Sequence, residues 1–141
     1  MMLVPTLLEV VGLKMPEFNH GVKQYPMSGV SMAYTFEAKP DAPTRKKVQY
    51  YEMFGTRGIW KEGWHAAAVH APINGTGHFD EDEWELYNMA NDRSELHDCS
   101  REHPDMVADL SALWDRWASR VGVEPWERIK ALRREHKTRN G

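Results

Sequence analysis

Cysteine is almost absent from this chain of 141 residues, in which Cys99 is the single thiol. One thiol can form no internal disulfide and cannot take part in a zinc site built on paired cysteines. Long apolar runs are also missing, so we expect no membrane segment. Residues 1–14 have neither a basic leading region nor a small-residue cleavage site, which predicts no export signal and a cytoplasmic location by default.

An excess of charge of one sign is the next feature that the chain lacks. The formal net charge is -3 at pH 7. A mildly acidic chain lacks the excess of positive charge that binds nucleic acid or an anionic membrane, and we expect neither as a partner. Basic residues gather in the tail at residues 124–141, for which a short basic helix and disorder are both open.

Aromatic and β-branched residues are concentrated in four stretches in the middle of the chain. These stretches, which are typical of β-strands, are residues 47–55, 57–60, 64–70 and 83–89. The second and third flank Gly63, where a positive φ permits the tight turn of an antiparallel hairpin. The sequence therefore predicts a four-stranded antiparallel sheet.

A helix over residues 104–121 is predicted by apolar residues that recur at steps of three and four. These residues are Val107, Leu110, Trp114, Trp117 and Val121. Pro104 suits the first helical turn, and Gly122 suits the left-handed position after the last one. The helix and the sheet together predict an α+β fold with one core between them. Five tryptophans are expected in that core: Trp60, Trp64, Trp84, Trp114 and Trp117.

The first 45 residues have a different character. Residues 4–13 predict an apolar helix that needs a large partner surface. The side chains that require this surface are Leu7, Leu8, Val10 and Val11. Residues 14–43 are rich in proline and glycine and predict a long irregular loop draped over another surface. So long a loop is unusual in a small domain, and with the helix it predicts that the chain is truncated.

The histidines and the cysteine do not form a recognisable catalytic or metal-binding pattern. The pairs His97 with His103 and His65 with His70 are six and five residues apart. Neither separation fits the helical or the strand spacing of paired ligands, so we expect no metal site in this chain. Cys99 lies between two histidines, but proximity in sequence does not establish a catalytic base, and an ordinary thiol is expected.

Lys61 and His65 lie on either side of the predicted hairpin turn. On such a turn we expect them to lie near each other at one end of the sheet, where they could bind an anion. The alternative is an exposed pair of cations without a ligand. The acidic residues 80–83 lack the glycine and the spacing of a calcium loop, and they predict a solvated turn.

Four segments, taken in order, resemble the C-terminal part of the arylsulfatases in the sulfatase and alkaline-phosphatase-like superfamily. They are "VPTLLEVVGL", "GVKQYPMSGVSMAYTF", "QYYEMFGTRGIWKEGWHAAA" and "FDEDEWELYNMANDRSELHDCSREHPDMVADLSALW". The resemblance implies that residues 1–45 are the helix and surface loop that end a large α/β catalytic domain. It further implies that residues 46–123 form the small C-terminal domain and that residues 124–141 are a basic tail.

The chemistry implied by this resemblance is the hydrolysis of sulfate esters. The family uses a formylglycine made from Cys or Ser in a Cys/Ser-x-Pro-x-Arg motif, beside a calcium ion held by Asp and Asn side chains. Cys99 is followed by Ser100, Arg101 and Glu102, so the motif is missing, and the paired aspartates have no counterpart. Calcium and formylglycine are therefore implied for a full-length enzyme, with no catalytic residue, metal ligand or cofactor in this chain.

One site residue is implied by position. Many sulfatases have a lysine after the Gly-Trp of this hairpin, where it reaches the substrate sulfate, and His65 holds that place here. The resemblance thus implies a C-terminal fragment that forms one wall of a sulfate ester pocket through His65, with Lys61 as a second candidate. We expect it to need the missing N-terminal sulfatase domain and to be inactive alone. The alternative is a free-standing, non-catalytic interaction module.

Overall fold

The computed structural model describes residues 3–39, 42–70 and 81–139. Internal contacts divide the chain into two compact units, an N-terminal unit (Met1–Lys46) and a C-terminal unit (Lys47–Gly141). Each unit has its own set of helices and strands. Within the described residues, no helix has the length and the apolar character that crossing a membrane requires.

The N-terminal unit is mostly irregular, as its proline and glycine content predicts. Its elements are helix α1 (Leu3–Val10), strands β1 (Phe18–Asn19) and β2 (Val22–Lys23), and the short 3-10 helix η1 (Ala33–Thr35). The two short strands form an antiparallel hairpin that the sequence did not predict. Thr6 of α1 is buried, and its hydroxyl oxygen accepts a hydrogen bond from the Met32 N–H at 2.9 Å.

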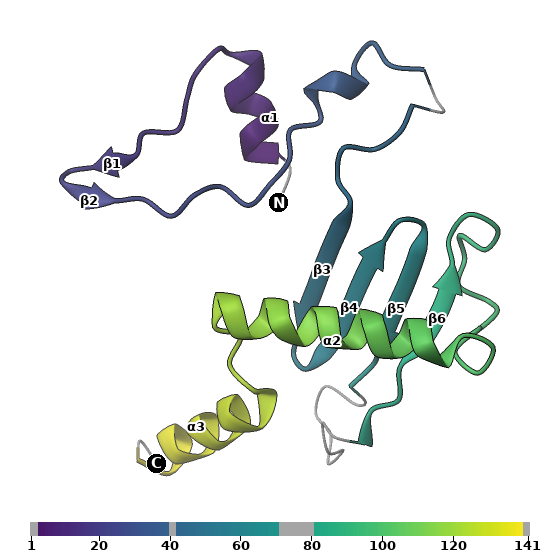
Figure 1. The fold of residues 1–141 in the computed structure, drawn as a ribbon. Coiled ribbons are helices and arrows are strands. Elements are labelled where there is room, and N and C mark those ends of the chain that lie inside the picture. The colour runs from purple at the N-terminus through teal and green to yellow at the C-terminus, as the bar shows by residue number, and fades with distance from the viewer. Residues whose placement is uncertain (1–2, 40–41, 71–80, 140–141) are drawn as a thin grey trace. The chain divides into compact units, whose positions relative to one another are not determined.

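The C-terminal unit contains the predicted sheet. Its strands are β3 (Val48–Met53), β4 (Thr56–Lys61), β5 (Trp64–Ala68) and β6 (Glu85–Asn88). They pair antiparallel in the order β3-β4-β5-β6, so each strand lies beside its neighbour in sequence (Figure 1). Between β4 and β5, Glu62 and Gly63 have φ values of 49° and 91°. Two successive positive φ values are typical of the tight turns that match the twist of a hairpin.

Helix α2 (Pro104–Val121) crosses one face of this sheet (Figure 1). The core lies between them and combines residues of the helix with one residue from each of three strands. Its buried members are Leu110, Trp114 and Ala118 of α2 with Ile59, Ala66 and Leu86 of β4, β5 and β6. Gly122 ends the helix in the left-handed conformation, with φ of 72°. The predicted α+β fold and the predicted helix are confirmed.

The tryptophans follow the alternation of the strands more strictly than the sequence analysis assumed. Trp64 and Trp84 pack against the core, as do the two helical tryptophans. Trp60 does not, and the prediction that places it in the core is wrong. Successive side chains of a strand point to opposite faces of the sheet. Because Ile59 faces α2, Trp60 must face the other way.

Helix α3 (Trp126–Arg139) follows α2 and answers the question that the basic tail left open. Trp126 is buried, with 6% of its surface exposed. Its ring packs against Phe54 in the turn between β3 and β4, with the ring centroids 5.4 Å apart. The described part of the tail is therefore a helix that begins at a buried aromatic anchor.

Candidate functional site

His65 lies on the sheet face that points away from α2. Its neighbour in sequence, Ala66, is part of the core, so the alternation of β5 turns the imidazole to the opposite side. Directly across the sheet, His65 is paired with Trp60 of β4 and with Tyr87 of β6. The His65 side chain is 19% exposed. The ring is thus held among aromatic neighbours and still reaches solvent.

Glu95 fixes the orientation of the His65 ring. The distance between His65 Nδ1 and Glu95 Oε1 is 2.7 Å. A carboxylate only accepts, so Nδ1 carries the proton and donates it, and Nε2 is left for another partner. Glu95 lies 30 residues after His65 and has a φ of 55°.

Gly58 leaves the space that the His65 ring occupies. A Cβ atom added to Gly58 would lie 3.2 Å from His65 Nε2, which is closer than a side chain normally tolerates. Tyr51 approaches the ring edge-on, with the centroids 5.9 Å apart. Around these groups is a hollow of about 640 Å³, which we call the open-face hollow. Its lining includes Tyr51, Met53, Gly58, Trp60, His65 and Glu95, together with Tyr50, Arg57 and Trp117, which lie on the α2 side of the sheet. Cavities of this size accommodate small organic ligands.

Lys61 and His65 both lie beside the hairpin turn, as expected, but on opposite faces of the sheet, so Lys61 does not join His65 at this site. In the hairpin, Lys61 pairs with Trp64, whereas His65 pairs with Trp60. Lys61 therefore shares the face of α2, and His65 shares the open face. The Lys61 side chain is exposed and lines a different hollow, of about 440 Å³, beside the start of α2.

Tyr87 of β6 lies beside His65 of β5 in the sheet. Its hydroxyl donates a hydrogen bond to Glu85 Oε2 at 2.9 Å. Burial of the ring, together with the Glu85 carboxylate, raises the pKa of Tyr87 from 10.0 to about 12. The carboxylates of Asp98 and Glu95 act in the same direction. Tyr87 therefore stays neutral at physiological pH and serves as a hydrogen-bond donor rather than as a charge.

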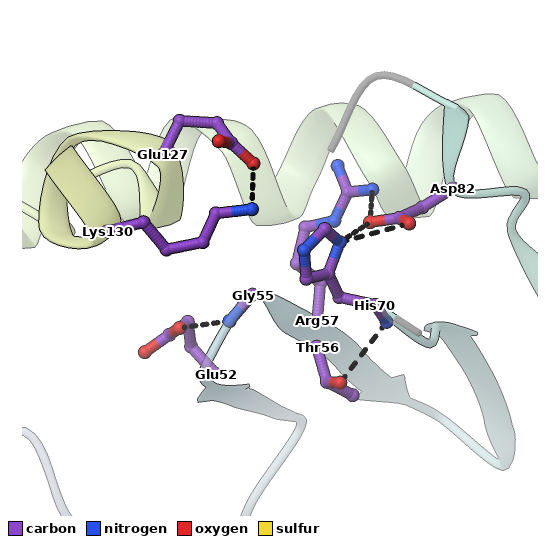
Figure 2. Close-up of polar contacts among 8 residues, drawn as sticks. All are labelled: Glu52, Gly55, Thr56, Arg57, His70, Asp82, Glu127 and Lys130. Carbon is purple, nitrogen blue, oxygen red and sulfur yellow. Dashed lines mark hydrogen bonds and ion pairs between the residues drawn. The ribbon is translucent and has the colours of Figure 1, made fainter. Parts of the chain in front are cut away.

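A second polar cluster is buried on the α2 side of the sheet. Figure 2 shows the side chains of Arg57, His70 and Asp82 pointing toward one another. Asp82 Oδ2 lies 3.0 Å from His70 Nδ1 and 3.4 Å from Arg57 Nη2. The backbone N–H of His70 also donates a hydrogen bond to the Thr56 hydroxyl oxygen at 3.2 Å. The cluster ties the ends of β4 and β5 to the segment before β6.

This cluster was not predicted from the sequence. Asp82 was expected in a solvated turn, yet its side chain is only 8% exposed. The sequence feature that could have revealed the cluster is Arg57. This charged residue lies two positions before Ile59 and hence on the core-facing side of β4. A buried arginine requires an acidic partner. The sequence alone does not say which of the nearby carboxylates supplies it.

A third group of polar side chains lies in the loop between β6 and α2. His97, Cys99 and Glu102 each offer one possible ligand atom, and these three atoms lie within 4.8 Å of one another. Burial and the carboxylates of Glu102, Asp98 and Asp92 raise the pKa of the Cys99 thiol.

Asp98, in the same loop, has a lowered pKa, although burial alone would raise it. Hydrogen bonds from the backbone of Leu86 and Ser100 and from the Ser100 hydroxyl outweigh it and lower that pKa.

The residues present do not fit the calcium and formylglycine of the sulfatases. Calcium takes six to eight oxygen ligands. Among the described residues, the one set of three side chains close enough to hold a metal ion is that of His97, Cys99 and Glu102, with a single carboxylate. Cys99 also lies in a segment without the required proline and arginine positions. We therefore derive no catalytic step through either group.

Comparison with known proteins supports the resemblance to sulfatases. No protein-family model matches the chain. An uncharacterized sulfatase of Schizosaccharomyces pombe is 31% identical over 83 residues, which are 57% of this chain and 14% of that protein. The sulfatase resemblance is confirmed by this relative. The chain spans only about a seventh of the relative's length, so the activity of the whole protein is not transferred with the match.

Solved structures show the same fold. A protein from a Bacteroides thetaiotaomicron locus for the metabolism of multiple glycosaminoglycans has a TM-score of 0.54 at 18% identity, over 82% of this chain and 24% of that one. Ps i-CgsB has a TM-score of 0.54 at 23% identity, over 99% and 30% of the two chains. A protein solved with its substrate D-glucosamine-2-N,6-O-disulfate has a TM-score of 0.53 at 20% identity, over 87% and 24%. Each structural neighbour extends well beyond the part that this chain matches.

Proposed function

We propose that this chain is the C-terminal part of an arylsulfatase-like protein and that its open sheet face forms one wall of a sulfate ester pocket. The observation that carries the proposal is His65, which Glu95 orients at 2.7 Å on the edge of the open-face hollow. His65 also holds the place of the sulfate-binding lysine in the resemblance. We do not include Lys61 in the proposed wall, because the strand register puts it on the face of α2.

The imidazole of His65 would bind the ester as a cation. With one proton, held on Nδ1 by Glu95, the ring presents only an acceptor at Nε2. A sulfate oxygen is also an acceptor, so contact with it requires a second proton on Nε2. The Glu95 carboxylate can balance the resulting positive charge.

The opposite wall of the pocket would come from a sulfatase N-terminal domain. Apolar side chains of the N-terminal unit support this partner, because several are more than half exposed. They are Leu3, Leu7, Val10, Val11 and Leu13, with exposed fractions of 58%, 55%, 57%, 61% and 63%. An exposed apolar patch of this kind marks an interaction surface. The limited share of the structural neighbours that the chain covers agrees with a missing domain.

A binding titration tests the role of His65 directly. Phenyl sulfate is added to isotope-labelled chain while backbone and imidazole NMR signals are recorded. We expect shifts at the open face in the wild type and in Lys61→Ala, and none in His65→Ala. Lys61→Ala is the matched control, because it removes a cation from the same hairpin but from the other face. Binding that survives in His65→Ala would refute the proposed pocket wall.

An activity assay tests whether the chain works alone. We expect purified chain to hydrolyse an aryl sulfate no faster than His65→Ala and Cys99→Ala, because no formylglycine motif is encoded. Turnover above both variants would overturn the proposal of an inactive fragment.

The free-standing interaction module is kept as a second candidate because the C-terminal unit has a core of its own. The behaviour of the full chain in solution distinguishes this module from a sulfatase fragment. A monomer that melts in one cooperative transition favours the module. Aggregation that a separate sulfatase N-terminal chain relieves favours the fragment.

A further inference from the structure

The loop between β6 and α2 brings three different metal-ligating side chains together, with His97 and Glu102 exposed and Cys99 less exposed. His97, Cys99 and Glu102 each offer one ligand atom, and these atoms lie within 4.8 Å of one another. We propose that this group binds a divalent cation of the zinc class. None of the three residues lines the open-face hollow.

The distances suit zinc after small side-chain adjustments. Zinc binds sulfur at about 2.3 Å and nitrogen or oxygen at about 2.0–2.2 Å, so ligands around a tetrahedral ion lie roughly 3.3–3.7 Å apart. His97 Nε2 and Glu102 Oε1 are already 3.6 Å apart. No separation in the group exceeds this range by more than about 1 Å. Rotation of the exposed His97 and Glu102 side chains can close that gap, because they are 73% and 62% exposed.

The backbone of the loop is fixed before any ion binds. The Asp92 carboxylate accepts hydrogen bonds from the N–H groups of Leu96 and His97, at 2.8 Å and 2.9 Å. The Cys99 N–H donates to the Leu86 carbonyl of β6 at 2.8 Å, and the Cys99 carbonyl accepts from the Glu102 N–H at 3.0 Å. Each of the three ligand residues is therefore tied to the sheet or to its own turn. Preorganisation of this kind lowers the entropic cost of forming a site.

The donor set selects the class of ion. A thiolate sulfur, an imidazole nitrogen and one carboxylate oxygen suit a borderline-soft cation such as zinc better than calcium or magnesium, which prefer oxygen. On binding, the Cys99 thiol transfers its proton to solvent and the thiolate bonds to the ion, so one proton is released per ion. Three protein ligands leave the fourth tetrahedral position for water or for a group of another molecule.

Cobalt and zinc titrations test the site in the full chain without an affinity tag. Cobalt(II) is used as a spectroscopic probe, and zinc affinity is measured by calorimetry. We expect one ion per chain, a sulfur-to-cobalt charge-transfer band and the visible bands of tetrahedral cobalt. We expect Cys99→Ser to abolish the charge-transfer band, and His97→Ala to weaken zinc binding by about tenfold or more.

The matched control is His20→Ala, which removes an exposed histidine of the N-terminal unit. It should bind zinc like the wild type. Circular dichroism of the Cys99 and His97 variants checks that helix α2 still forms. Absence of binding in the wild type, or equal zinc affinity in the wild type, Cys99→Ser and His97→Ala, would overturn the proposal.

Discussion

Gly55 and Gly63 occupy equivalent positions in two successive hairpin turns, but their surroundings differ. Their φ values are 93° and 91°. A Cβ atom at Gly55 would lie 2.9 Å from His70 Cδ2 and 3.0 Å from Trp126 Cδ1, whereas one at Gly63 would meet nothing within 4 Å. We expect Gly63→Ala to cost about 1–2 kcal/mol through its backbone conformation. Gly55→Ala should cost about 1–3 kcal/mol more through the clash.

Urea denaturation of the two variants and the wild type measures both terms, and the difference between the variants isolates the packing term. Equal losses of unfolding free energy would show that His70 and Trp126 do not pack against Gly55 as closely as the structure indicates.

Tyr87 makes stability depend on pH in the alkaline range. The pKa of Tyr87 is raised from 10.0 to about 12, so below pH 10 the phenol is protonated in both the folded and the unfolded chain. Between pH 10 and about 12 the folded chain keeps the proton that the unfolded chain loses. The free energy of unfolding therefore falls as the pH rises through this interval.

In Tyr87→Phe the free energy of unfolding should no longer fall with pH between pH 10 and about 12 for this reason. Below pH 10 its dependence on pH should match that of the wild type. Denaturation curves of the wild type and the variant at successive alkaline pH values test the expectation. Tyrosinate absorbance of the folded wild type should also contain one late titration that the variant lacks. Parallel stability profiles of the two proteins would contradict the raised pKa.

At the scale of elements, α3 depends on its first residue. Among residues 127–136 no side chain is buried, and isolated helices of about this length are marginal in water. Trp126 is 6% exposed and packs against Phe54. We expect Trp126→Ala to destabilise the unit by about 3–5 kcal/mol and to release α3.

Amide hydrogen exchange distinguishes this local effect from global unfolding. Protection should disappear in α3 while that of α2 and the sheet persists at a reduced level. Leu132→Ala, at an exposed position of the same helix, is the control and should leave protection in α3 largely unchanged. Retained protection of α3 in Trp126→Ala would show that another contact anchors the helix.

The elements were also the part of the structure that local sequence signals predicted best. The bounds of α2 agree with the spacing from Val107 to Val121 and with its flanking Pro104 and Gly122. The hairpin around Gly63 agrees with the turn chemistry of that residue. These signals depend on a few neighbouring residues, so they can be interpreted without knowledge of the rest of the fold.

For the whole molecule, we expect the C-terminal unit to fold without the first 46 residues. Its core draws on β4, β5, β6 and α2, all of which lie after Lys47. Chain 47–141 should unfold in one cooperative transition close to that of the full chain. It should also aggregate less, because the exposed apolar side chains of α1 are removed.

Calorimetry and light scattering of the full chain and of chain 47–141 provide the comparison. An unfolded or strongly aggregating 47–141 would show that the N-terminal unit is needed for the fold of the sheet and α2.

The α+β class, the four strands and the main helix could be predicted from local periodicity, and the sulfatase resemblance from the order of four segments. Which side chains meet became known only from the folded chain. Glu95 reaches His65 from 30 residues away, and Asp82 joins His70 and Arg57 in a buried cluster. Lys61 lies apart from His65 because alternate residues of a strand face opposite sides of the sheet. Contacts between distant segments depend on how strands pair and on which face a helix covers, and no local pattern records either.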